Sequence, residues 1–372
     1  MKSMKYDSPE DITSVELKIQ TVSGVLNPTI YANRLNQLPL EIVVKALKVN
    51  EQGEETILNF ADETWLTLLN LRFAVTDKLL SREADSGWCF TRHVNNYSRE
   101  VGPAGIGIRQ DSGPSDLRGG EKIVVFYLYS TQPGRERIAV GLDTPGGKHF
   151  STADSAEGAE KSSVSVVAGL PVRYRRSGLD LNWNKELGQT HVPMKYSWGG
   201  NGGSWSENIS AHYDNLYITL ASRYQIQDYA IHGYDENPEY PHRVAAYWTC
   251  HDDQHMLIAD PPGDAPGEDT LGFEGKAGWR DASLSELVQV GYDMHLRFKY
   301  NEIPNAICWT HFSFAASEHW PLPDGTGLHV ENTDIYEYTC DNWFSFHDIY
   351  GNYGEFSIRY NYDTQNIEVI QR

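Results

Sequence analysis

The sequence predicts an all-β protein, and three observations support this fold class. Short runs in which apolar and polar residues alternate recur along the chain, as expected of half-buried strands. The clearest run extends from Tyr292 to Tyr300. Ile123 to Tyr129 is rich in β-branched and aromatic residues, and clusters of glycine and proline separate the runs as turns.

In the first half of the chain, the runs around Val15–Ile19 and Leu40–Ala46 each predict a strand. The stretch 65–80 has two interpretations, because its apolar residues fit the spacing of a helix and, from Leu69 to Phe73, that of a strand. Ser8-Pro9-Glu10-Asp11 is expected to begin a helical turn.

Three consecutive runs predict a pair of hairpins. Ile123–Tyr129, Ile138–Leu142 and the segment at Phe150 are separated by turn residues at Pro133-Gly134 and Pro145-Gly146-Gly147. Near the end of the chain, Phe356–Tyr362 and Ile367–Val369 predict another hairpin across Asp363–Asn366.

Region 14–153 is similar to the immunoglobulin-like modules of bacterial surface and adhesin proteins. The similarity rests on EKIVVFYLYST, RIAVGLDTPGGKHFST and Gly87-Trp88. It implies a β-sandwich with a buried tryptophan.

The 372-residue length predicts two or three domains. Residues 154–163, DSAEGAEKSS, are small, polar and charged, as is typical of a linker. We therefore expect an immunoglobulin-like β-sandwich over residues 1–153, a linker over 154–163, and a larger β-rich domain, a sandwich or prism, over 164–372.

The charge balance limits the classes of partner. Lysine and arginine total 31 against 51 acidic residues, which gives a formal net charge of −20. This excess of acids disfavours binding to nucleic acid or to an anionic membrane. No apolar run has the length of a membrane span, and no apolar segment follows the first lysines. We expect synthesis in the cytoplasm without a classical signal peptide, with export or release left open.

The four cysteines, Cys89, Cys250, Cys308 and Cys340, lie far apart and form no Cys-x-x-Cys pair. This spacing predicts reduced thiols rather than a zinc ribbon or a disulfide framework.

Motifs for catalysis and cofactor binding were not found, so we expect a protein that is not an enzyme and uses no cofactor. His251 and His255 have the spacing of metal ligands on a helix, but strand-like flanks favour a polar loop. Asp235, Glu236 and Glu239 could bind Ca²⁺ through their carboxylates, but a solvated turn around Pro238 is the favoured interpretation.

A glycine-rich loop between two tryptophans is the candidate ligand-binding site. It comprises Trp198, Gly199, Gly200, Asn201, Gly202, Gly203 and Trp205. Glycines let backbone amides approach a ligand closely, and an indole face can stack on a sugar ring. The alternative is a tight loop between strands whose tryptophans cap a core.

This loop and the strand-like run Asn215–Leu220 resemble the start of a jacalin-like lectin repeat, a β-prism sugar binder. The resemblance implies that the glycine loop contributes backbone groups to a sugar site. The family adds a Gly-x-x-x-Asp loop, and the only such pattern here is Gly107–Asp111.

The expected function is therefore a non-enzymatic bacterial binding protein that recognises a glycan or a cell surface. The first alternative is a self-assembling structural protein, or a toxin or appendage component, whose exposed aromatics make protein contacts. The second alternative is a carbohydrate-active enzyme, since carboxylate pairs could exist among 51 acids.

Overall fold

The computed structural model confirms the all-β class, since 54% of the protein is in β-strands. Among the described residues, α1 (Asp62–Leu68) is the only α-helix. The immunoglobulin-like character of the N-terminal region stays a prediction. The structure describes residues 6–102, 115–116, 119–156, 159–184, 189–198, 204–221, 224–233, 243–250, 253–259, 267–276, 290–300, 303–315, 319–321, 327–329, 338–339, 342–361, 364 and 366–372.

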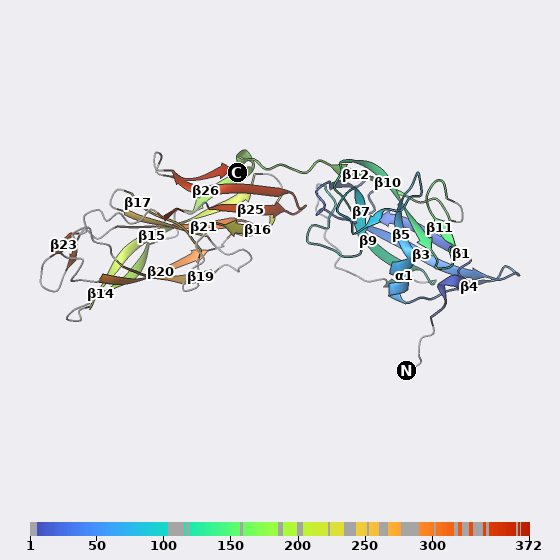
Figure 1. Ribbon diagram of the computed structural model, residues 1–372, viewed down its shortest axis with the longest axis horizontal. Helices are drawn as coiled ribbons and strands as arrows, with labels where there is room; N and C mark the ends of the chain where they lie inside the picture. Colours follow the sequence, from blue (N-terminus) through green and yellow to red (C-terminus); the bar gives the residue numbers. More distant parts are fainter. Residues whose placement is uncertain are drawn as a thin grey trace, which may run out of the picture. The chain divides into compact units, whose positions relative to one another are not determined.

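The chain forms two compact units, which are coloured along the sequence in Figure 1. Unit 1 comprises Met1–Arg173 and Ile349–Asn352, and unit 2 comprises Tyr174–Asp348 and Tyr353–Arg372. Each unit therefore contains two separate stretches of the chain.

Unit 1 contains two sheets that face one another across a shared core. The first is seven-stranded with the order β1-β3-β9-β7-β6, and β4 and β8 pair with β3 and β9. Its strands are β1 (Ser14–Thr21), β3 (Leu38–Val49), β4 (Glu55–Ile57), β6 (Ser81–Arg82), β7 (Trp88–Thr91), β8 (Ser115–Asp116) and β9 (Lys122–Ser130). The second is five-stranded with the order β11-β10-β12-β2, and β5 pairs with β10. Its strands are β2 (Thr29–Tyr31), β5 (Leu69–Phe73), β10 (Gly134–Asp143), β11 (His149–Ser151) and β12 (Val164–Gly169).

The core of unit 1 follows from alternation along these strands. In β3 every second residue from Leu38 to Val44 is buried, because successive side chains point to opposite faces of a sheet. Inward residues of both sheets, such as Phe126 of β9 and Val140 of β10, belong to one hydrophobic cluster. Packing between the sheets therefore makes unit 1 a two-layer sandwich.

Residues 65–80 contain both elements that the sequence left open. Helix α1 buries Trp65 and Leu68, and β5 starts at Leu69 and buries Leu69 and Leu71. The apolar spacing changes from helical to alternating at this junction, so the stretch fitted both patterns. The short 3-10 helix η1 (Pro9–Asp11), with Ser8 at its N-cap, is the helical turn expected there.

One of the two hairpins predicted in unit 1 is wrong. β10 and β11 pair as expected, with Leu142 opposite Phe150. β9 and β10, however, lie in different sheets, since β9 pairs with β3, β7 and β8 whereas β10 pairs with β5, β11 and β12. The turn residues after Ser130 carry the chain from one layer of the sandwich to the other, and turn residues alone do not distinguish this crossing from a hairpin.

The segment 154–163, predicted to be a linker, lies inside unit 1. Arg137 forms an ion pair with Asp154 at 2.7 Å, and the Ser162 hydroxyl accepts a hydrogen bond from the Ile19 amide at 3.1 Å. β12, which follows this segment, pairs with β10 in unit 1. The boundary between the compact units falls after Arg173. Linkers between domains and loops between two strands of one domain are both polar. Composition alone therefore did not show that 154–163 is a loop within unit 1.

Residues 349–352 complete unit 1 from a distant part of the sequence. The Asn33 side-chain amide donates to the Tyr350 carbonyl at 2.9 Å and to the Asn352 side chain at 3.2 Å. Gly351 has a φ of +75°, and a Cβ at this position would lie 2.5 Å from the Leu35 Cβ. The four residues therefore fit tightly into unit 1.

Unit 2 also consists mainly of strands. Its nine-stranded sheet has the order β19-β20-β14-β15-β21-β18-β17-β24, and β13 pairs with β15. The strands are β13 (Leu179–Asn184), β14 (Gln189–Trp198), β15 (Ser204–Leu220), β17 (Arg243–Cys250), β18 (Asp253–Ala259), β19 (Gly267–Lys276), β20 (Val290–Tyr300), β21 (Ile307–Ala315) and β24 (Tyr338–Thr339). A 3-10 helix, η2 (Arg176–Gly178), precedes β13, and β22 (His319–Pro321) and β23 (Gly327–His329) form a two-stranded sheet.

A four-stranded sheet, which we call the C-terminal sheet, covers this larger sheet. It has the order β16-β25-β26-β27, with β16 (Ile226–His232), β25 (Trp343–Asp348), β26 (Tyr353–Asn361) and β27 (Asn366–Gln371). Trp309 of β21 packs against Phe344 of β25 with ring centroids 6.5 Å apart. β26 and β27 form the C-terminal hairpin that the sequence predicted, with Ile358 opposite Val369.

The described residues contain no helix with the length and apolar character needed to cross a membrane. Cys89 and Cys308 are both buried.

Candidate functional site

The predicted ligand-binding loop connects two paired strands of unit 2. Tyr196 of β14 pairs with Trp205 of β15, and Ser197 pairs with Ser204. Trp198 ends β14, so the backbone brings Trp198 and Trp205 to the same end of one hairpin. Gly199, Gly200, Asn201, Gly202 and Gly203 lie outside the described residues. The two tryptophans thus lie at the paired ends of β14 and β15, and the role of the loop in binding stays a prediction.

His255, one of the two histidines noted in the sequence, lies beside a third histidine, His311, in the structure. His255 lies within β18 and not in the polar loop expected between strand-like flanks, and His251 lies outside the described residues. The His255 Nδ1 atom is 3.1 Å from the Nε2 atom of His311 on the neighbouring strand β21. Burial, and next the nearby His255, lowers the pKa of His311 to about 3. His311 is therefore neutral, and the two rings share one hydrogen bond between His255 Nδ1 and His311 Nε2.

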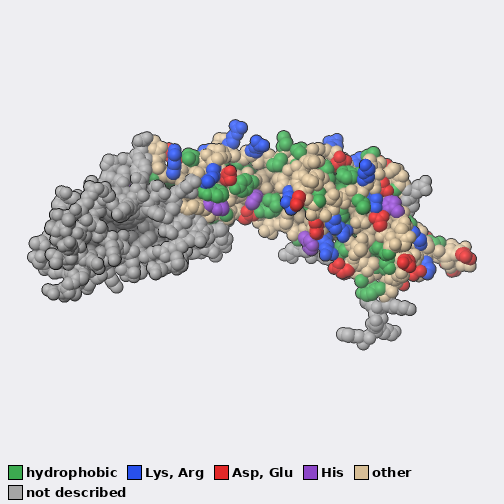
Figure 2. Space-filling model, viewed as in Figure 1, with side chains coloured by type: hydrophobic (Ala, Val, Ile, Leu, Met, Phe, Trp, Pro, Cys, Tyr) green, Lys and Arg blue, Asp and Glu red, His purple; other side chains and the backbone are tan. Residues whose placement is uncertain are grey.

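Charged side chains on unit 1 are largely paired with neighbours of opposite sign. Lys45 contacts Glu16 at 2.8 Å, and Lys48 contacts Asp11 at 2.8 Å. On the face of unit 1 visible in Figure 2, basic and acidic side chains are interspersed. This view therefore offers no broad patch of one sign as a candidate site.

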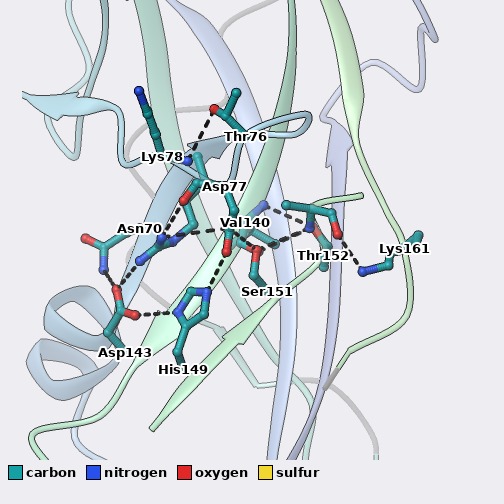
Figure 3. Close-up of polar contacts among 12 residues, drawn as sticks. Asn70, Thr76, Asp77, Lys78, Val140, Asp143, His149, Ser151, Thr152 and Lys161 are labelled. Atoms are coloured by element: carbon teal, nitrogen blue, oxygen red, sulfur yellow. Dashed lines mark hydrogen bonds and ion pairs between the residues drawn. The ribbon is translucent and has the colours of Figure 1, made fainter. Parts of the chain in front are cut away.

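A dense polar cluster, which we call the brace, joins β5, β10 and β11 in unit 1 (Figure 3). The two ring nitrogens of His149 lie 2.7 Å from a carboxylate oxygen of Asp143 and 2.7 Å from one of Asp77. Arg72, whose side chain is 10% exposed, donates to the same Asp143 carboxylate at 2.7 Å. The cluster thus places one arginine and one histidine against two carboxylates.

The second carboxylate of the brace is held by short contacts as well. The Ser151 hydroxyl donates to Asp77 at 2.7 Å. Desolvation raises the pKa of Asp77, but the hydrogen bonds from Ser151 and His149 and the charge of Arg72 outweigh it and lower the pKa below its ordinary value. Because Ser151 donates to a carboxylate and not to the imidazole, the cluster lacks the serine–histidine contact of a nucleophilic site. Its chemistry is that of a structural network.

The outward side of the C-terminal sheet has a different character. In β25, Phe344, Phe346 and Asp348 are buried, and the alternate residues Trp343, Ser345 and His347 are half-buried on the opposite side. We call this side the outer face. It consists of residues from three of the four strands, β16, β25 and β26, and of the residue after β27, namely Asp228, Ala230, His232, Trp343, Ser345, His347, Tyr353, Glu355, Ser357 and Arg372.

Cross-strand pairs fix the polar groups of the outer face. His347 lies opposite Asp228, and its Nδ1 atom is 2.9 Å from the Asp228 carboxylate. The Tyr353 hydroxyl donates to Glu355 at 2.9 Å, and its ring lies 5.4 Å from that of His347. Tyr353 is 45% exposed. An aromatic ring accessible to solvent therefore lies next to positioned hydrogen-bonding groups.

At the other end of the outer face, Trp343 is covered on both sides. The His232 ring is stacked on it with centroids 3.6 Å apart, and the guanidinium carbon of Arg372 lies 4.4 Å from the indole centroid. Two groups this close to one ring would overlap on the same side, so they occupy opposite faces. His232 also contacts the Ser345 hydroxyl at 3.0 Å. Desolvation and then the charge of Arg372 lower the pKa of His232, so this ring is neutral near pH 7.

Sequence reasoning missed the outer face. The signal was present in WFSFHD, residues 343–348, where tryptophan, serine and histidine alternate with two phenylalanines and an aspartate. That alternation predicts one buried side and one side with unusual aromatic content. Recognising a site also required the pairing of β16, β25, β26 and β27, which local patterns do not give.

Comparison of the chain with protein-family models gives no match, and comparisons with curated proteins and with solved structures give none either. The function is therefore argued from the residues and their geometry.

Proposed function

We propose that this protein is a non-enzymatic binding protein that recognises glycans, and that the outer face of the C-terminal sheet contacts the sugar. The observation that carries the proposal is the exposed Tyr353 ring beside His347, Ser345 and Glu355 on an open sheet surface. An aromatic ring can stack on the C–H face of a sugar, while neighbouring polar groups bond its hydroxyls.

The way in which the polar groups are held also suits ligand binding. Asp228 and Glu355 each accept a hydrogen bond from a neighbouring side chain, so their orientations are set before a ligand arrives. Such preorganisation reduces the entropy lost on binding. A preorganised sheet surface is suited to recognising an extended ligand.

The hairpin loop between Trp198 and Trp205 remains the second proposed contact. Its two tryptophans and its glycines supply the same kinds of interaction, ring stacking and close approach of backbone amides. The two surfaces make separate predictions, because Trp205→Ala changes only the loop and Tyr353→Ala changes only the outer face.

A glycan array followed by calorimetry tests the proposal. We expect wild type to bind a defined glycan class, and Tyr353→Ala to weaken that binding by about tenfold or more with little change in thermal stability. Tyr6→Ala is the matched control, since Tyr6 is an exposed tyrosine of unit 1. If wild type binds no glycan and instead forms oligomers as its concentration rises, the proposal fails and the self-assembling alternative replaces it.

A further inference from the structure

Tyr353 and Glu355 lie on the same side of β26, and both are accessible to solvent. Tyr353 is 45% exposed, and Glu355 is half-buried. The Tyr353 hydroxyl donates to the Oε2 atom of Glu355 at 2.9 Å, and no other side chain in the described part of the chain donates to this carboxylate. Because a carboxylate has two acceptor oxygens, the Oε1 atom of Glu355 can accept from a ligand that lies on the Tyr353 ring.

Two other carboxylates of the C-terminal sheet are held by neighbouring side chains. Asp228 lies 2.9 Å from the Nδ1 atom of His347. Glu368 accepts a hydrogen bond from the Asn361 side chain at 2.7 Å. Of these three acidic residues, Glu355 is therefore the one best placed to contact a ligand beside the exposed ring.

The charge of Glu355 dominates the electrostatic surroundings of Tyr353. Burial raises the pKa of the Tyr353 hydroxyl, and the hydrogen bond to Glu355 and the charge of Glu355 raise it further. A hydrogen bond with Ser345 and the charge of Arg372 oppose this increase but do not reverse it. Arg372 itself lies over Trp343 at the other end of the outer face. The negative charge of Glu355 thus outweighs the positive charge of Arg372 at the exposed ring.

An aromatic ring beside a carboxylate suits a sugar that carries an ammonium group. The ring can stack on the C–H face of the sugar, and a cation near an aromatic face is attracted to it. An ammonium N–H donating to a carboxylate forms a charge-assisted hydrogen bond, which is about twice as strong as a neutral one. The hydroxyl end of the Tyr353 ring is 2.9 Å from the carboxylate, so a substituent at the edge of a stacked sugar reaches Glu355. The net charge of −20 also attracts a cationic ligand.

We infer that the outer face selects glycans with free amino groups, with Tyr353 stacking on a sugar ring and Glu355 binding the ammonium group of that sugar. This inference rests on the proposed function and names its ligand class.

Titration calorimetry on the full chain with three β-1,4-linked hexasaccharides tests the inference. The probes are the hexamer of glucosamine, the hexamer of N-acetylglucosamine and cellohexaose, which carry an amine, an acetamide and a hydroxyl at the same position of each sugar. The buffer is mildly acidic, so that most of the glucosamine amines are protonated. We expect the glucosamine hexamer to bind about tenfold or more tightly than either neutral probe, and its affinity to fall as salt is raised.

Three variants identify the residues responsible. Glu355→Gln keeps the shape of the side chain and an acceptor oxygen but removes the charge. It should lower the affinity for the glucosamine hexamer about tenfold and leave any binding of cellohexaose unchanged. Glu51→Gln is the matched control, because it makes the same change in net charge at an exposed residue of unit 1, and it should change affinity less than about threefold. Tyr353→Ala should weaken binding of every probe that wild type binds, since stacking does not depend on the amine.

The outcomes separate this inference from the proposed function. If wild type binds a neutral probe as tightly as the glucosamine hexamer, or if Glu355→Gln weakens charged and neutral probes equally, the amino-sugar ligand class is overturned while glycan binding stands. If none of the three probes binds, the amino-sugar inference is likewise overturned, and the glycan array then decides whether glycan recognition itself is lost.

Discussion

The brace of unit 1 and the outer face of unit 2 use similar residues in opposite ways. In the brace, His149 contacts two carboxylates, and Arg72 is nearly buried beside one of them. On the outer face, His347 contacts one carboxylate on an open sheet, and the neighbouring Tyr353 is 45% exposed. Groups that satisfy one another stabilise the fold, whereas a surface that keeps an exposed ring beside positioned donors and acceptors remains able to bind.

The largest effect on stability is expected from breaking the brace. Arg72→Met leaves the carboxylate of Asp143 without its nearly buried partner, and loss of such a partner costs about 3 kcal/mol of unfolding free energy. Urea denaturation measures this loss. Arg137→Met is the matched control, because Arg137 and Asp154 form an exposed pair whose loss should cost less than about 1 kcal/mol. Equal costs for the two variants would show that the brace contributes no more than a surface ion pair.

A smaller loss is expected from disturbing the distant segment that completes unit 1. Gly351 has a positive φ, and an alanine Cβ at this position would lie 2.5 Å from the Leu35 Cβ. We therefore expect Gly351→Ala to lower the free energy of unfolding by about 2–3 kcal/mol. Gly147→Ala is the matched control, because Gly147 also has a positive φ, of +82°, but an added Cβ would have no atom within 4 Å. It should cost about 1 kcal/mol. The difference between the two variants in thermal or urea unfolding reports the tight packing of residue 351, and no difference would contradict it.

The brace should also give stability a dependence on acid. The pKa of Asp77 in the folded protein lies below its ordinary value of 3.8, so its ionised form stabilises the fold. This contribution is present above the unfolded-state pKa and is lost as pH falls through the folded-state pKa. Asp77→Asn, which also tolerates the positive φ of 57° at this position, should remove it.

Urea unfolding from pH 7 to pH 3 checks this sign. The stability difference between wild type and Asp77→Asn should stay constant from pH 7 to about pH 5 and shrink below about pH 4. A difference that grows as pH falls would mean that Asp77 is not stabilised in its ionised form.

The smallest effect on stability is expected on the outer face. Trp343→Ala removes a half-buried indole with its guanidinium and imidazole stacking, and each such contact contributes about 0.5–1 kcal/mol. The free energy of unfolding of unit 2 should therefore fall by only about 1–2 kcal/mol, whereas glycan binding should be strongly reduced. A loss as large as that for Arg72→Met would assign Trp343 to the core instead.

Much of the fold was predictable because alternation is a local property. Val15–Ile19, Leu40–Ala46 and the C-terminal hairpin were all recognised from the pattern of buried and exposed residues. The partners of each strand were not, as the separation of β9 and β10 into different sheets shows. Pairing depends on contacts between residues far apart in the sequence, and the same turn residues serve a hairpin or a crossing between layers.

The candidate site was less predictable for the same physical reason. The Trp198–Trp205 loop was conspicuous because its residues are adjacent in the sequence. The outer face joins His232 of β16, Trp343 of β25 and Arg372, which are brought together only by the order of the C-terminal sheet. Similarly, His255 finds its partner His311 on a neighbouring strand.

Oxidative footprinting with and without a bound oligosaccharide tests the central claim most directly, because it reports which exposed rings the ligand covers. With a saturating oligosaccharide ligand, we predict slower oxidation of the exposed Tyr353 and an unchanged rate for Tyr6 of unit 1. Protection confined to Trp198 and Trp205, or to unit 1, with Tyr353 oxidised at its free rate, would contradict the assignment of the outer face as the glycan-binding surface.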